Sequence, residues 1–175
     1  MPGTARSALQ RRNKAMHHNE ADPEELKQKF WKALADSPFV FLERKAEPGE
    51  GVVMTAKLDP DANSAIWFFT QRSNSLAQMG EAVCTFASKG HDVFARFDGR
   101  LSEETSRERL DKEWDRITAA WFDGGKDDPN LLMLRMDLGE AQIWDSDLGL
   151  YYNTKMILGG DVRDQMPKHT AEVQL

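Results

Sequence analysis

The stretch VVMTAKLDPDANSAIWFFT, residues 52–70, is the part of the chain that decides the class of fold. Residues 52–58 and 65–70 are rich in β-branched, aromatic and aliphatic side chains, and residues 59–63 between them carry Asp, Pro and Asn. The first composition favours strands and the second favours a tight turn. We therefore expect two sequential strands joined by a short turn, as in an antiparallel sheet.

Similar runs continue on both sides of this pair. Further strands are expected over residues 39–43, 82–88, 92–101, 131–138 and 141–145, with turns at residues 49–51, at residues 89–91 and at Gly139. Six or seven short strands within roughly a hundred residues favour a closed barrel, because closure removes exposed edges. The expected fold is mainly β, in the α+β class: an antiparallel β-barrel of six to seven strands with flanking helices.

Helices are expected on either side of the run of strands. Asp22 is a suitable N-cap, Pro23 suits the first position of a helix, and Pro38 marks its end. Helical periodicity returns over residues 102–121 and predicts one helix there. Its apolar stripe consists of Leu110, Trp114, Ile117 and Trp121.

One domain with polar ends is expected, because 175 residues suit a single core and no internal repeat is present. Residues 1–21 offer no periodic apolar face and predict a disordered arm. Residues 22–160 are expected to form the folded domain, and residues 161–175 a polar C-terminal tail.

Charge and composition exclude several classes of function. The net charge is −6 and the body of the chain has no basic stripe, which argues against nucleic-acid binding. No apolar run is long enough to span a bilayer, so no membrane partner is expected. The single cysteine, Cys84, lies in an apolar segment; we expect it to be buried, and a lone cysteine fits a cytoplasmic location.

Motifs of autonomous catalysis are missing from the sequence. It contains no glycine-rich phosphate loop of the Rossmann or Walker type, no nucleophile elbow and no metalloprotease histidine motif. The four histidines are scattered without ligand spacing, so no metal site is expected. A barrel of this kind suits a protein whose chemistry is carried by a bound cofactor.

Several short segments, taken in order and spacing, carry a resemblance to a known family. They are ELKQKFWKAL (25–34), MTAKLD (54–59), IWFFT (66–70), FASKGHD (86–92), AWFDGGKDDPN (120–130), LRMD (134–137) and IWD (143–145). Together they resemble the pyridoxamine 5'-phosphate oxidase-like superfamily of FMN-binding split barrels, general stress protein branch. The resemblance covers about residues 24–158 and implies FMN bound at the interface of a homodimer.

The resemblance also implies which residues hold the cofactor. The strand Val53, Met54 and Thr55 would present its backbone to the flavin ring. Phe69 and Thr70 would end the adjacent strand beside the ring and the ribityl chain. Residues 71–75 would form the phosphate loop, where Arg72 offers a charge-assisted donor. Further donors there are Ser73, Asn74 and Ser75. The alternative for this loop is a capped turn that binds no ligand.

Three more residues complete the implied site. Lys89 would line the edge of the ring, the alternative being a solvated lysine in a hairpin. Trp121 and Trp144 would lie near the flavin or the partner subunit. As lone tryptophans they are most simply explained as anchors of the core or of a dimer interface.

Departures from the family pattern qualify the implied function. Leu76 stands where many members carry a lysine, and Val52 and Val53 stand where many carry Arg-Pro, so charge neutralisation would fall chiefly to Arg72. The C-terminus offers nothing that aligns with the substrate-phosphate residues of true pyridoxamine phosphate oxidases, so vitamin B6 oxidation is not expected. The expected function is an FMN-binding general stress protein with low-specificity redox activity. Alternatives are a non-catalytic flavin-binding sensory module, or the same barrel with a deazaflavin or haem, for which His91 is the sole candidate ligand in the body.

Overall fold

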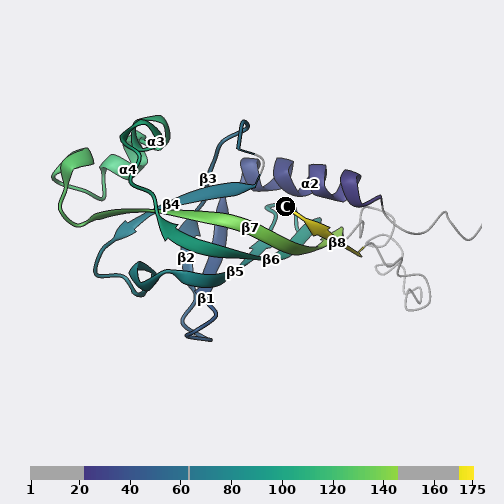
Figure 1. Ribbon diagram of the computed structural model, residues 1–175. Coiled ribbons are helices and arrows are strands. Elements are labelled where there is room, and N and C mark those ends of the chain that lie inside the picture. The colour runs from purple at the N-terminus through teal and green to yellow at the C-terminus, as the bar shows by residue number, and fades with distance from the viewer. Residues whose placement is uncertain (1–21, 63, 146–169) are drawn as a thin grey trace, which may run out of the picture.

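An antiparallel sheet of eight strands is the central element of the computed structural model, which describes residues 22–62, 64–145 and 170–175 (Figure 1). In chain order the strands are β1 (Phe39–Arg44), β2 (Val52–Thr55), β3 (Lys57–Leu58), β4 (Ala65–Gln71), β5 (Gly80–Ala87), β6 (Val93–Glu103), β7 (Leu131–Asp145) and β8 (Thr170–Gln174). The helices are α2 (Pro23–Asp36), α3 (Arg107–Glu113) and α4 (Arg116–Ala119), with short 3-10 helices η1 (Ser75–Gln78) and η2 (Gly125–Asp127).

The barrel is closed by one segment of chain that serves both ends of the sheet. The strand order is β2-β1-β5-β6-β7-β4-β3, and β8 pairs with β7 beside this path. The two outermost strands, β2 and β3, are consecutive in the chain and are separated only by Ala56, whose N–H donates to the Pro38 carbonyl at 2.7 Å. Residues 52–58 thus pair with β1 and then with β4. This confirms the expected antiparallel split barrel, with seven strands on the closed path.

Alternating side chains of the strands fill the barrel, and α2 completes the core. The helix begins and ends where the sequence predicts, and the Asp22 side chain accepts a hydrogen bond from the Glu24 N–H at 3.0 Å. Its apolar face is buried. The ring of Phe30 lies 5.9 Å from that of Phe86 and 5.3 Å from that of Phe97. In Figure 1, α2 lies at one end of the sheet and α3 and α4 lie together at the other.

The prediction of a single helix over residues 102–121 is wrong. β6 continues to Glu103, and the residues after it form two short helices, α3 and α4. Trp114 has extended backbone angles, and the Asp115 side chain accepts the Thr118 N–H at 2.7 Å as the N-cap of α4. Aspartate favours such caps over helix interiors, which explains the break. The expected buried stripe is also absent, since Ile117 and Trp121 are both 73% exposed.

Two further expectations fail near the C-terminus. β7 is one continuous strand, where a break at Gly139 was expected. Residues 170–175 are not a polar tail: β8 pairs with β7, and the Leu175 N–H donates to the Gly139 carbonyl at 3.0 Å. The Leu175 side chain is buried in the core. The expected arm, residues 1–21, and the rest of the expected tail lie outside the described residues.

Candidate functional site

The outward-facing side of the closing segment, where β2 and β3 meet β4, is here called the seam. Its residues are Val53, Thr55 and Lys57 on residues 52–58, and Phe69 on β4. Met54 and Ala56 point into the core, so their neighbours along the strand face outward. Val53 and Thr55 are exposed, and β2 contacts β4. Val53 and Thr55 therefore present their side chains on the outside of the barrel, on a strand that pairs with β1.

Five of the predicted site residues lie on the strands of this seam, but not all present their side chains there. Val53 and Thr55 face outward, and Phe69 is half-buried beside them. Met54 and Thr70 are buried, Met54 among the core residues and Thr70 on the same face of β4 as Phe68. Met54 and Thr70 can contribute only backbone groups to a ligand on the seam.

The predicted phosphate loop, residues 71–75, is a closed and capped turn directly after β4. The Asn74 N–H donates to the Gln71 carbonyl at 2.9 Å, and the Asn74 side chain accepts the Leu76 N–H at 2.9 Å. The Arg72 guanidinium pairs with Glu103 at 2.5 Å, which raises the pKa of Arg72. The turn thus matches the capped geometry of the alternative reading, and its cation already has a carboxylate partner.

Two neighbours of this turn were missed or misjudged from the sequence. Leu76 points into the core and is 1% exposed, so it does not occupy a solvent-facing position that a lysine could share. Arg44, at the end of β1, donates to the carbonyls of Ser75 at 3.3 Å and Met79 at 3.1 Å. It also pairs with Glu47 at 3.1 Å. These hydrogen bonds from Arg44 stabilise the end of the turn and the 3-10 helix η1 that follows it. No sequence motif indicated this role for Arg44.

Two of the remaining predicted residues, Lys89 and Trp144, lie away from the turn. Lys89 is in the loop between β5 and β6, and Trp144 lies near the end of β7, opposite Phe94. Both are at the end of β5 remote from Arg72; the eight residues of β5 span about 26 Å. Trp121 follows α4 and is exposed. A single copy of the chain does not bring Lys89 or Trp144 to the turn.

An ion pair that the sequence did not reveal borders the seam. Lys57 on β3 pairs with Asp115, and its ammonium lies 6.0 Å from the centroid of the Phe69 ring. Burial would raise the pKa of Asp115, but hydrogen bonds from Lys57 and Thr118 outweigh this effect and lower it to about 2. The neighbouring Trp114 packs edge-on against Phe69, with centroids 5.8 Å apart. The one available signal was the position of Lys57, two residues beyond Thr55 on the same strand face.

A second charged cluster holds α3 over β4. The buried carboxylate of Asp59 accepts hydrogen bonds from Arg109 and from Lys112, the latter at 2.7 Å. Lys112 and Arg109 together hold the pKa of Asp59 well below its usual range. The Arg109 guanidinium lies 4.1 Å from the centroid of the Trp67 ring, and the Trp67 Nε1–H donates to Glu104 at 3.1 Å. These contacts explain why residues 107–119 cover the outside of β4.

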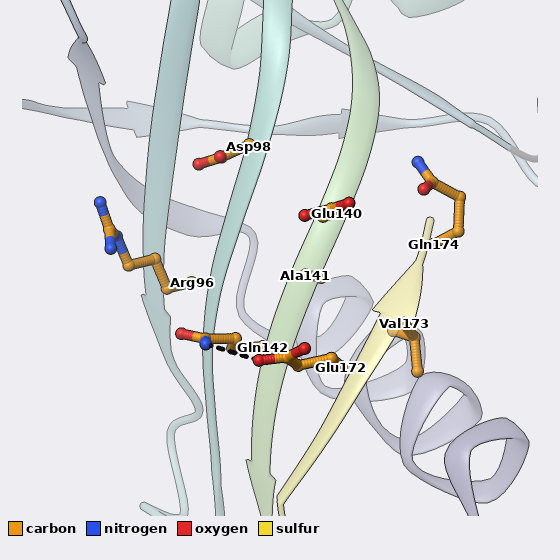
Figure 2. A pocket seen from close by; sticks show the side chains of 8 residues that line it. All are labelled: Arg96, Asp98, Glu140, Ala141, Gln142, Glu172, Val173 and Gln174. Atoms are coloured by element: carbon orange, nitrogen blue, oxygen red, sulfur yellow. Dashed lines mark hydrogen bonds between the residues drawn. The ribbon is translucent and has the colours of Figure 1, made fainter.

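Two shallow depressions occur elsewhere on the outer surface of the sheet. One of about 380 Å³ lies over β6, β7 and β8, and Figure 2 shows its lining, including the hydrogen bond from Gln142 to Glu172 at 3.1 Å. Another of about 410 Å³ adjoins it at Arg96 and reaches Phe41 on β1. Neither contains a predicted site residue. Within the described ranges no group of His, Cys, Asp or Glu could hold a metal ion, and no helix is long and apolar enough to cross a membrane.

A closed antiparallel barrel with an accessible strand seam beside a capped turn defines the split-barrel class. Residues 25–167 match the family described as pyridoxamine 5'-phosphate oxidase like, and the chain belongs to this family. This confirms the superfamily that the sequence segments indicated.

Solved structures agree with this assignment and with the general stress branch. A candidate general stress protein 26 from Jannaschia sp. CCS1 is 29% identical with a TM-score of 0.71, covering 88% of this chain and 100% of its own. A candidate general stress family protein from Xanthomonas campestris pv. campestris is 44% identical with a TM-score of 0.67, covering 74% and 93%. The general stress FMN/FAD binding protein of Xanthomonas citri is 42% identical with a TM-score of 0.67, covering 73% and 93%. No curated protein matches the chain.

Proposed function

We propose that this protein is a flavin-binding protein of the general stress type that holds FMN along the seam. The observation that carries the proposal is the seam itself: Val53 and Thr55 lie exposed on β2, and Phe69 on the neighbouring strand β4 is only half-buried. An aromatic ring and flat strand backbone suit the face and edge of a planar ligand. The Xanthomonas citri relative, described as an FMN/FAD binding protein, supports the same assignment.

The donors around the turn fit a phosphate group. Arg72 carries five N–H donors, and Glu103 engages one of its terminal nitrogens, so donors remain. Ser73 and Ser75 are exposed at the turn and add hydroxyl groups. Asn74 is less suited, because its side-chain oxygen already caps the turn. Arg72, Ser73 and Ser75 are therefore the residues we assign to the FMN phosphate.

A homodimer is part of the proposal. Lys89 and Trp144 lie at the end of the sheet remote from Arg72, so a second copy is needed if they are to meet the same flavin. The outward-facing side of β1, β2, β6 and β7 offers apolar side chains for such an association. They are Phe39, Phe41, Val53, Phe94 and Trp144. Phe41 lies opposite Val53 and Phe94 lies opposite Trp144, and neighbouring exposed apolar side chains of this kind often mark interaction surfaces.

Bound flavin would supply hydride or electron transfer, while the residues of this chain would bind and orient it. The test is the visible absorption spectrum of the purified protein, before and after addition of FMN, followed by anaerobic mixing with NADH or NADPH. Flavin bands that co-purify or appear on titration would support the proposal, and bleaching on mixing would add redox turnover. A colourless protein that fails to take up added FMN would overturn it.

A further inference from the structure

The cations that border the seam are already paired with carboxylates. Arg72 pairs with Glu103 at the turn, and Lys57 pairs with Asp115 beside Phe69. The Lys57 pair is the more enclosed, since the Lys57 side chain is 15% exposed and that of Arg72 is 50% exposed. Enclosure weakens solvent screening, so the Lys57 pair sets the charge beside the aromatic part of the seam.

The Asp115 carboxylate is held in place from two directions. One oxygen accepts the Thr118 N–H at 2.7 Å, and the other accepts the Lys57 ammonium. The preceding residue, Trp114, packs against Phe69 and lies 6.1 Å from the Phe122 ring, centroid to centroid. The Asp115 side chain is 45% exposed, but these two hydrogen bonds hold its carboxylate in one orientation.

The helix before Asp115 is anchored as well. Asp59 binds Arg109 and Lys112 of α3, and Arg109 stacks over Trp67. Residues 107–119 can withdraw from the seam only if this buried carboxylate loses both partners. The structure thus keeps the Lys57–Asp115 pair assembled.

We propose that Asp115 determines the substrate class of the seam, which accepts an uncharged polar aromatic molecule and rejects an anionic one. The inference rests on the proposed function, because a flavin bound on the seam would extend the aromatic surface of Phe69, beside Lys57, on which such a molecule would stack. An anion that approached Lys57 would lie against the Asp115 carboxylate, and like charges at that range repel. A carboxamide can instead accept from Lys57 and donate to Asp115, which satisfies both groups.

The test compares benzamide with benzoate, which are similar in size and differ in charge, by titration calorimetry on flavin-free and FMN-loaded protein. The wild type is expected to prefer benzamide. Asp115→Asn keeps the oxygen that caps α4 but removes the negative charge. The affinity for benzoate should then be at least about ten-fold higher than that of the wild type, which is the effect of one charge-assisted hydrogen bond. The affinity for benzamide should change little.

Two variants separate this effect from a disturbed helix. Asp111→Asn makes the same substitution in the same segment, but its carboxylate pairs with Lys126 at 2.6 Å and not with Lys57. It should leave both titrations unchanged. In the double variant Lys57→Met/Asp115→Asn the gain for benzoate should disappear.

The inference is overturned if Asp111→Asn produces the same gain, if the gain survives without Lys57, or if no variant binds either probe. Failure of the proposed function is visible separately, as the absence of flavin absorbance after FMN is added. The titrations of flavin-free protein still report the effect of the ion pair in that case.

Discussion

The ion pair between Arg72 and Glu103 lowers the contribution to FMN affinity that we expect from Arg72. Its guanidinium would meet the FMN phosphate, but Glu103 shares it in the structure. Arg72→Ala should weaken FMN about ten-fold, the lower part of the range for a charge-assisted hydrogen bond. Riboflavin, which lacks the phosphate, should bind as before. Quenching of flavin fluorescence measures both affinities.

Glu103→Gln is the companion variant, because it releases Arg72 from its carboxylate. FMN should then bind more tightly than to the wild type, again with riboflavin unchanged. Equal changes for the two flavins in either variant would show that Arg72 is a structural residue of the turn and not a phosphate ligand.

Leu76→Lys tests whether the neighbouring position can supply a second cation. The Leu76 side chain lies in the core, so a lysine there would bury an amine without a partner. We expect a loss of about 3 kcal/mol or more in the free energy of unfolding, and no gain in FMN affinity. Urea denaturation measures the loss, with Leu76→Met as the control that keeps an apolar side chain. A lysine variant as stable as the methionine variant would contradict this placement.

At the scale of elements, Asp59 anchors α3 in a manner that depends on pH. Its pKa is lower in the folded chain than the ordinary value of about 3.9, so the folded state binds the proton more weakly than the unfolded state. The stabilisation is therefore complete above the ordinary pKa and is lost progressively as the pH falls from that value through the lower pKa of the folded state. The free energy of unfolding should fall from about pH 5 downward, and fall less in Asp59→Asn.

Asp61→Asn is the matched control for this measurement. Asp61 lies two residues away and its side chain is exposed, so its removal should leave the pH dependence close to that of the wild type. If Asp59→Asn and the wild type lost stability in parallel, the anchor would not depend on the charge of Asp59.

The strand β8 makes a second prediction at this scale. Leu175 is buried, and β8 covers the edge of β7 from Glu140 to Trp144. Leu175→Ala should cost about 2–3 kcal/mol, at the lower end for a buried leucine because a chain terminus can adjust. Thermal unfolding gives the loss, and Gln174→Ala, which removes an exposed side chain of the same strand, should have little effect. A cost below about 0.5 kcal/mol would mean that the end of β8 does not contribute to the core.

Local sequence signals predicted those strands and helices that are determined by local pattern and capping. They did not predict features that depend on contacts between residues distant in the sequence. The strands around residues 52–70 and the helix capped by Asp22 follow from pattern and capping, and both are present. The contact of Asp115 with Lys57 and the strand β8 depend on tertiary partners, which no local pattern reveals. The same holds for the site: the resemblance indicated Arg72, but its partner Glu103 lies on another strand.

For the whole molecule, the proposed homodimer predicts a measurable change in mass. Phe41 is exposed on the outer face of β1, close to Val53. Phe41→Lys should shift the sedimentation of the protein from dimer to monomer at micromolar concentration, because a charge there opposes burial of the apolar side chains around it. The melting temperature of the dilute protein should change little.

Ala35→Lys provides the control, since it adds the same charge at an exposed position on α2, away from that face. It should leave the sedimentation unchanged. A wild-type protein that sediments as a monomer with FMN bound would contradict the dimer, and equal dissociation by both variants would contradict the choice of face.

The closure of the barrel by residues 52–58 has a thermodynamic consequence. Because one segment pairs with β1 through β2 and with β4 through β3, its separation from either strand opens the barrel. A molecule seated on this segment therefore bridges both ends of the sheet, and its binding is linked to unfolding of the entire barrel, not to the opening of a local loop. A ligand that occupies the seam should therefore raise the free energy of unfolding of the whole protein.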